Sequence, residues 1–192
     1  METVKIGNQT WMVKNLDVDT FKNGDPILEA ETEEEWINAG KKKQPAWCYY
    51  DNDPANGEKY GKLFNWHAVN DPRGLAPSGW HIPSDEEWTI LTDHLGGVEV
   101  AGKKMKFTEF WAENKGISGN GSNESSFSGL PGGARDIDGQ FEDLFRFGSW
   151  WSSSEGGGTY GPWTRGLGCP YDLARKGSEY KNAGISVRCV KD

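Results

Sequence analysis

The chain has 192 residues, of which 35% are hydrophobic, and a formal net charge of −8. This acidic balance excludes the basic surface that nucleic-acid phosphates require, so we expect no nucleic-acid partner. No apolar run approaches the length of a membrane span. Ten Trp, eight Phe and six Tyr supply apolar area for one core, and 26 Gly indicate many turns. We therefore expect a single domain over residues 1–192.

Short strands and one helix are predicted in the first third of the chain. Residues 3–13 indicate two strands around a Gly7-Asn8 turn. A capping box of Thr32 and Glu35 predicts a helix of about two turns that ends at Gly40. Residues 46–50 are typical of an aromatic strand, and residues 51–57 of a loop.

The middle of the chain predicts a second helix. Ser84 and Glu87 form another capping box, and Trp88 begins an apolar series at helical spacing. Gly96-Gly97 should end this helix. Residues 97–103 match the front of a phosphate-binding loop, but Lys104 stands where Ser or Thr would bind magnesium. We interpret that stretch as a helix end followed by a loop.

The second half is predicted to be rich in strands and loops. Residues 112–133 indicate a long loop, and Asp138-Gly139 a hairpin turn of type I′. Strands are expected at residues 150–154 and 185–190, with an alternating stretch at residues 160–176. Trp150 and Trp151 should point to opposite faces of their strand, one into the core and the other supporting a binding surface. Two early helices followed by strands predict the α+β class.

The candidate catalytic residues have structural explanations. None of His67, His81 and His94 belongs to an H-E-x-x-H pattern. His81 lies near Ser84 and Asp85, which suggests a catalytic triad. Ser84, however, caps a helix, and a carboxylate in the first turn is favoured by the helix dipole. The same explanation applies to the acidic clusters at residues 33–35 and 85–87. We predict no enzyme activity.

An oxygen-rich loop raises one cofactor alternative. Asp51, Asn52, Asp53 and Asn56 are residue types that ligate calcium, but the EF-hand spacing with its distal Glu is missing. Calcium thus remains an alternative to the prediction of no cofactor and no metal site.

The N-terminus and the cysteines leave the compartment open. METVKIGNQTW lacks the apolar core of a signal peptide. The chain is therefore either cytoplasmic or has lost an export signal. Cys48, Cys169 and Cys189 are an odd number, which excludes complete pairing within the chain. No C-x-x-C spacing occurs, so a zinc cluster is not expected.

Six motifs occur in order along nearly the whole chain: TVKIGNQTWMVKNL, YGKLFNWHAVN, APSGWHIPSDEEWTILTDHLGG, NESSFSGLPGGARD, WWSSSE and GISVRCVKD. Together they resemble the Fibrobacter succinogenes major paralogous domain. That resemblance implies a C-type lectin-like fold, in the branch shared with formylglycine-generating enzymes. Members are mostly bacterial, often from Bacteroidetes, and usually surface lipoproteins with no catalytic activity established for the class. The resemblance therefore implies a cell-surface or extracellular protein.

The chain departs from its relatives at three points. Ala76 stands where members commonly have Cys, so a bridge to a partner such as Cys189 would be absent, and the implied export is weakened. The lectin calcium triplets are missing, with Gln44-Pro45-Ala46 only a partial match, so calcium-dependent sugar binding is not implied. The paired cysteines of the formylglycine-type active site are also not identifiable.

In residues 162–175, positions with large side chains alternate with positions that hold an irregular mixture of residue types. Some C-type lectin-like proteins are variable proteins of diversity-generating retroelements, in which adenines are mutated in codons such as AAC. The irregular positions between 156 and 174 hold Gly, Thr, Tyr, Cys, Pro, Asp and Ala, all reachable in this way. We therefore predict a variable ligand-binding region at residues 156–176. The large residues of the alternation would form its scaffold, with Tyr171 serving both as scaffold and as contact: Trp163, Arg165, Leu167, Tyr171, Leu173 and Arg175.

The leading hypothesis is a non-enzymatic module that presents this region to a protein or glycan ligand. Tyr160, Thr164, Tyr171 and Asp172 would make contacts, because Tyr offers large contact area at low entropic cost. Gly166 and Gly168 would shape the surface, and Cys169 would lie in it as a free thiol. The predicted binding residues are Tyr160, Trp163, Thr164, Gly166, Gly168, Cys169, Tyr171, Asp172 and Ala174. The alternatives are a formylglycine-generating-type oxidase or other enzyme that uses His81, and a structural or adhesive surface domain.

Overall fold

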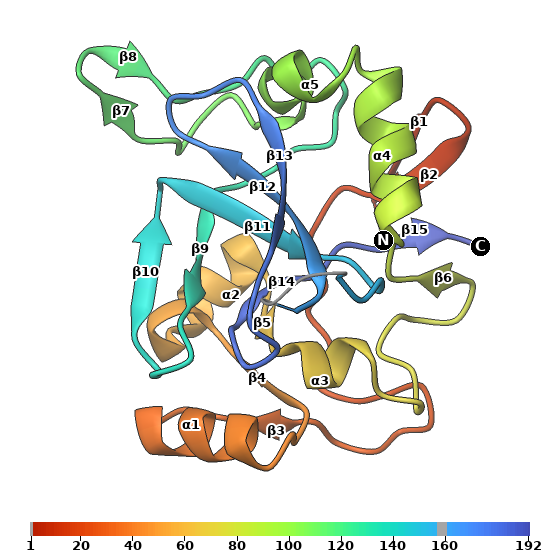
Figure 1. Ribbon diagram of the computed structural model, residues 1–192, viewed down its shortest axis with the longest axis vertical. Helices are drawn as coiled ribbons and strands as arrows, with labels where there is room; N and C mark the ends of the chain where they lie inside the picture. The colour runs from red at the N-terminus through yellow and green to blue at the C-terminus, as the bar shows by residue number, and fades with distance from the viewer. Residues whose placement is uncertain (1, 157–160) are drawn as a thin grey trace.

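The computed structural model describes residues 2–156 and 161–192, and this part of the chain has an α+β architecture (Figure 1). Within it, the five α-helices all precede residue 106, and most strands of the largest sheet follow residue 131. The α+β prediction is therefore confirmed. Only two of the five helices were expected, however, and the other three have distinct physical origins.

The two expected helices begin at their capping boxes. In α1 (Glu33–Lys41), the Thr32 side chain accepts from the Glu35 amide, and the Glu35 carboxylate accepts from the Thr32 amide. The Ser84 hydroxyl and Glu87 carboxylate do the same for α4 (Asp85–His94). Each cap satisfies amides that have no partner within the helix.

Three helices were not predicted, and two of them lie where loops were expected. Residues 51–57 contain part of a 3₁₀ turn (Tyr50–Asn52) and the start of α2 (Pro54–Tyr60). Pro54 occupies the first turn of α2, and the Asp53 side chain accepts from the Ala55 amide, so this start signal was present in the sequence. The remaining two are α3 (Trp66–Val69) and α5 (Val98–Met105).

The stretch that matched a phosphate-binding loop is largely helix α5. Gly97 immediately precedes α5 without a side-chain cap, and α4 comes before it. A phosphate-binding loop instead requires a strand directly before the glycines. The predicted loop is therefore wrong, while the rejection of a phosphate-binding motif stands.

The first and last strands of the described chain lie in one four-stranded sheet of order β1-β2-β15-β6. The predicted strand pair at residues 3–13 is confirmed. The strand predicted at residues 185–190 is instead divided between two sheets, because β14 joins the larger sheet and β15 this one. The bounds are β1 (Thr3–Ile6), β2 (Gln9–Met12), β6 (Trp80–His81) and β15 (Val190–Lys191).

A nine-stranded sheet forms the centre of the molecule, with order β10-β9-β11-β14-β5-β4-β3 and with β12 paired to both β11 and β13. Strands β11, β12 and β13 make an antiparallel ribbon that lies below α5 and beside α4 in Figure 1. The strands are β3 (Leu28–Glu29), β4 (Ala46–Cys48), β5 (Leu63–Phe64), β9 (Gly132–Arg135), β10 (Phe141–Leu144), β11 (Phe147–Trp151), β12 (Trp163–Gly168), β13 (Ala174–Ser178) and β14 (Ile185–Ser186).

Several strand predictions need correction at their boundaries. The strand expected at residues 46–50 ends at Cys48, and that expected at residues 150–154 is β11, which ends at Trp151. The predicted loop at 112–133 contains the hairpin of β7 (Glu113–Asn114) and β8 (Ile117–Ser118). The β9–β10 hairpin is confirmed, but a type I′ turn is wrong. Such a turn needs two central residues with positive φ, and here Gly139 has a φ of 89° while Asp138 is not left-handed.

Adjacent tryptophans on β11 join two parts of the core. Trp150 and Trp151 point to opposite faces, as predicted, yet both are fully buried. Trp150 packs in a cluster with Trp11, Trp88 and Phe127, and Trp151 packs in a second cluster with Trp66. Neither therefore supports a solvent-facing surface. Ring contacts such as Trp11–Trp88, at 4.7 Å between centroids, contribute about 1 kcal/mol beyond their buried area.

Candidate functional site

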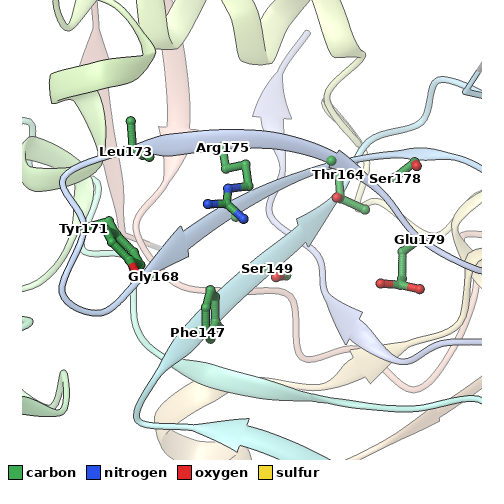
Figure 2. A pocket seen from close by; sticks show the side chains of 11 residues that line it. Phe147, Ser149, Thr164, Gly168, Tyr171, Leu173, Arg175, Ser178 and Glu179 are labelled. Carbon is green, nitrogen blue, oxygen red and sulfur yellow. The ribbon is translucent and has the colours of Figure 1, made fainter. Parts of the chain in front are cut away.

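A hollow of about 190 Å³ lies on the outer face of the β11–β12–β13 ribbon (Figure 2). Figure 2 shows Tyr171 and Phe147 toward one end, Arg175 between the strands, and Glu179 at the other end. The hollow is lined by Phe147, Ser149, Thr164, Gly166, Gly168, Tyr171, Leu173, Arg175, Gly177, Ser178 and Glu179.

The strand register explains which residues face this hollow. Thr164 pairs with Gly177, and Gly166 pairs with Arg175 across the β12–β13 ladder. Residues directly opposite each other in a ladder point to the same face, and positions two apart along a strand share it. The outer face of the ribbon is therefore built from even-numbered residues of β12 and odd-numbered residues of β13.

The inner face of the ribbon is fixed by the first turn of α4. The Arg165 guanidinium, 3% exposed, donates to Asp85 Oδ1 at 2.7 Å and to Thr89 Oγ1 at 3.0 Å. Lys176 Nζ lies 2.7 Å from the other Asp85 oxygen. Burial raises the pKa of Asp85, but hydrogen bonds from Lys176 and Arg165 outweigh it and hold the pKa below its usual range. Leu167 completes this face in the core.

The alternation changes phase in the turn at residues 169–173. The sequence pattern placed Leu173 and Arg175 with the scaffold and Ala174 with the variable set. In the structure Leu173 and Arg175 line the hollow, whereas Ala174 is 1% exposed and packs in the core. That part of the prediction is wrong because the turn between two strands need not contain an even number of residues. The alternation can therefore continue on the opposite face after the turn.

Lys106 and α5 hold this turn in place. Lys106 is 1% exposed, and its Nζ donates to the Tyr171 carbonyl at 2.8 Å and the Gly168 carbonyl at 3.5 Å. Burial lowers the pKa of Lys106, although Asp172 opposes the shift. A Cβ added at Gly102 would lie 2.3 Å from the Leu173 carbonyl oxygen, so α5 packs backbone to backbone against the turn. No pattern in the sequence indicated these supports.

Four of the predicted binding residues line the hollow: Thr164, Gly166, Gly168 and Tyr171. Tyr171 is 53% exposed, which suits a contact residue, whereas Thr164 is only 8% exposed. At Gly166 an added Cβ would meet only Ser149 Oγ, at 3.7 Å, so this position has room for a side chain.

The other predicted residues lie elsewhere. Cys169 is 8% exposed in the core, and its Sγ donates to the Ala112 carbonyl at 2.7 Å, so its expected surface position is wrong. Trp163 is half-buried beneath the Lys176 ammonium, 3.9 Å from the ring centroid. Asp172 faces Lys103 of α5 at 3.8 Å. Tyr160 lies outside the described residues.

Sequence reasoning missed seven residues of the hollow or assigned them to the scaffold: Phe147, Ser149, Leu173, Arg175, Gly177, Ser178 and Glu179. One signal in the sequence was available for four of them. Leu173, Arg175, Gly177 and Glu179 continue a period of two beyond the turn, with the phase that the structure shows. Phe147 and Ser149 come from a separate strand, and their pairing with β12 is not encoded locally.

A second hollow, of about 130 Å³, adjoins the first and shares Phe147, Ser149, Thr164 and Glu179 with it. It adds the carboxylates of Glu142 and Asp143. Burial raises the pKa of Glu142, and the neighbouring carboxylates raise it further. The combined concave surface thus has Arg175 between the strands and acidic side chains toward the end at Glu179, which suits a ligand bound by hydrogen bonds and charge.

His81 does not form a triad with its neighbours. Its two ring nitrogens lie 2.7 Å from Glu87 and 2.7 Å from Asp192. Burial lowers the pKa of His81, but these carboxylates outweigh it and raise the pKa above its ordinary value. Ser84 caps α4 and also contacts Glu87, so the predicted capping role of Ser84 is confirmed.

The oxygen-rich loop is also engaged in local structure. Asp53 caps α2, Asn56 donates to the Tyr50 carbonyl at 3.0 Å, and the Asn52 amide donates to the Glu31 carbonyl. Within residues 2–156 and 161–192, no group of three His, Cys, Asp or Glu could hold a metal ion.

The cysteines are free thiols in the described structure. Burial raises the pKa of both Cys48 and Cys189 to about 12, so neither is a thiolate at neutral pH. Cys189 and Ala76 lie in the same core cluster.

No helix in the described part of the chain is long and apolar enough to cross a membrane.

Together, these features define an α+β domain that carries a concave strand surface near its C-terminus. The chain belongs to the Fibrobacter succinogenes major domain family, whose family model matches residues 4–191. This confirms the family resemblance seen in the six motifs. Searches of curated proteins and of solved structures found no match to the chain.

Proposed function

We propose that the protein is a non-enzymatic binding module whose outer β11–β12–β13 face receives a protein or glycan ligand. The observation that carries this proposal is that one face of the ribbon is packed against the rest of the protein while the other face is concave and solvent-facing. The inner face is held by Arg165, Leu167 and Asp85, while the outer face is hollowed and presents Tyr171 and Arg175. Aromatic and Arg side chains contribute more binding energy per residue than other types.

The proposal includes a C-type lectin-like fold. Its support is membership of the family, an α+β architecture, and first and last strands that meet in one sheet. The family also supports a cell-surface or extracellular location.

A narrower proposal is that the outer face is diversified by a retroelement. Gly166 supports it, because a side chain there would enter the hollow without meeting backbone. Ala174 and Cys169 are both buried, so fewer positions than predicted would belong to the diversified surface. The genomic test is a near-identical downstream repeat, with adenine at each differing base, beside a reverse transcriptase gene. Its absence would overturn diversification and leave the binding module intact.

Glycan and protein arrays on the purified domain test the binding function directly. A Tyr171→Ala/Arg175→Ala variant should lose the signal of the native protein on a discrete set of ligands while melting at the same temperature. The matched control, Ile117→Ala/Lys41→Ala, removes one exposed apolar and one exposed basic side chain far from the hollow in sequence. It should bind as the native protein does. Equal binding by both variants would overturn the proposal and favour a structural or adhesive role.

A further inference from the structure

A separate hollow of about 310 Å³ shares no residue with the strand surface. It lies where the segment after β2, helix α2, the segment after α5 and the segment before β15 meet. Its size falls at the lower end of the range for small-molecule sites. Its lining combines cationic side chains with two phenylalanines, and its one carboxylate comes from Glu2.

The floor of this hollow contains a buried guanidinium. Arg188 is 1% exposed, and its Nε and Nη2 donate to Asn15 Oδ1 at 3.1 and 2.6 Å, while Nη1 donates to the Phe127 carbonyl. Among the residues that the structure describes, Arg188 forms no ion pair. Burial lowers the pKa of Arg188 to about 9, so the group is still charged at neutral pH. A buried charge without a counter-ion is energetically costly.

Two lysines add positive charge above this floor. Lys59 is half-buried, and Lys14 is exposed. Lys59 Nζ lies 3.4 Å from the ring centroid of Phe110 and, within the described residues, also has no carboxylate at ion-pair distance. Burial lowers the pKa of Lys59, although Glu109 opposes the shift. Three cationic side chains therefore face the hollow against the single carboxylate of Glu2.

An aromatic pair, half-buried Phe107 and exposed Phe110, forms one wall. The rings of Phe107 and Phe110 are stacked at 6.1 Å between centroids with an interplanar angle of 14°. Phe110 is 43% exposed and has a φ of 73°. A bulky residue in this left-handed region is strained, and such strain is concentrated at ligand-binding and active sites. The wall thus offers an apolar surface beside the cationic groups.

We propose that this hollow binds a small organic carboxylate with an apolar body, the carboxylate directed toward Lys59 and Arg188 and the apolar body against Phe107 and Phe110. The excess positive charge selects an anion, and a carboxylate would supply the counter-charge that Arg188 lacks. The apolar wall selects an organic anion over an inorganic one, because burial of apolar area adds affinity only for the organic anion.

The test uses 4-phenylbutyrate as the probe, with 4-phenylbutanamide as its neutral isostere and inorganic phosphate as an anion without an apolar body. Isothermal titration calorimetry should show the carboxylate binding at least about tenfold more tightly than either comparator, the effect of one charge-assisted contact. Equal affinity for the amide would overturn the charge argument. Equal affinity for phosphate would overturn the apolar part.

Variants locate the site without disturbing the buried arginine. Lys59→Gln should weaken binding of 4-phenylbutyrate about tenfold, and Phe110→Gly, which suits the positive φ, about fivefold. Lys41→Gln and Ile117→Ala, which lie outside this hollow, should leave the affinity for 4-phenylbutyrate unchanged. In NMR spectra, the side-chain Nε–H signal of Arg188 should shift with the carboxylate and not with the amide. The proposal would be overturned if the Arg188 signal did not move, or if Lys59→Gln and Lys41→Gln lost the same affinity for 4-phenylbutyrate.

Discussion

The inner and outer faces of β12 and β13 come from alternate residues of the same two strands, yet their surroundings differ. On the inner face Arg165 contacts Asp85 and Thr89, and Leu167 and Ala174 pack in the core. On the outer face Gly166 has open space. The comparison teaches that the buried contacts of this region lie mainly on one face, which leaves positions such as Gly166 on the other face open to substitution.

The largest effect should come from removing the inner-face carboxylate. Asp85→Ala leaves the buried guanidinium of Arg165 without a counter-ion, and we expect about 3 kcal/mol of destabilisation in urea unfolding. Lys176→Met is the matched control, since its ammonium is 41% exposed. It should cost less than about 1 kcal/mol. Equal destabilisation by Asp85→Ala and Lys176→Met would contradict the account in which Arg165 holds the inner face in place.

A smaller loss is expected where α5 contacts the turn before β13. Gly102→Ala places a Cβ 2.3 Å from the Leu173 carbonyl oxygen, and backbone cannot move aside as a side chain can. We expect about 2 kcal/mol of destabilisation by thermal unfolding, together with weaker ligand binding because Tyr171 shifts. Native stability in this variant would show that the turn is not held by α5.

The ion pairs of His81 give a pH-dependent effect that lies outside both faces. Because its pKa is raised in the folded state, His81 contributes stability that is present below pH 6.5 and lost as the pH rises through the folded pKa. The ring is partly exposed, so we expect at most about 1 kcal/mol. The melting temperature should fall as the pH rises above 6.5, and His81→Asn should flatten the profile. An unchanged profile in His81→Asn would contradict this assignment.

The smallest effect should come from the outer face. Gly166→Ala adds a methyl group at ordinary van der Waals distance from Ser149. We expect a change within about 0.5 kcal/mol of the native free energy of unfolding, measured beside Gly102→Ala. A loss as large as that of Gly102→Ala would show that the outer face is also constrained by packing.

Local signals in the sequence predicted those parts of the fold that local physics determines. Capping boxes predicted the starts of α1 and α4, because the Thr32 and Ser84 hydroxyls satisfy helix amides within three residues. Helix α5 was missed because Gly97 gives it no side-chain cap, and its first residues resemble a loop. The site was partly predicted for the same reason. Alternation placed Thr164 and Gly166 on one face.

The pattern failed where long-range contacts decide. Lys106 binds the Gly168 and Tyr171 carbonyls across more than 60 positions of sequence, and that contact helps to fix the turn after β12. The phase of Ala174 and Arg175 depends on this turn. Arg188 was likewise part of a recognised motif, but its position beneath a hollow depends on Asn15, far away in the sequence.

Protease resistance of two displayed libraries tests the central claim most directly. One library randomises outer-face positions 166, 171 and 175, and the other randomises inner-face positions 165, 167 and 174. We predict that most members of the outer library remain folded and that few members of the inner library do. Equal survival of the two libraries would contradict the division between a structural face and a binding face.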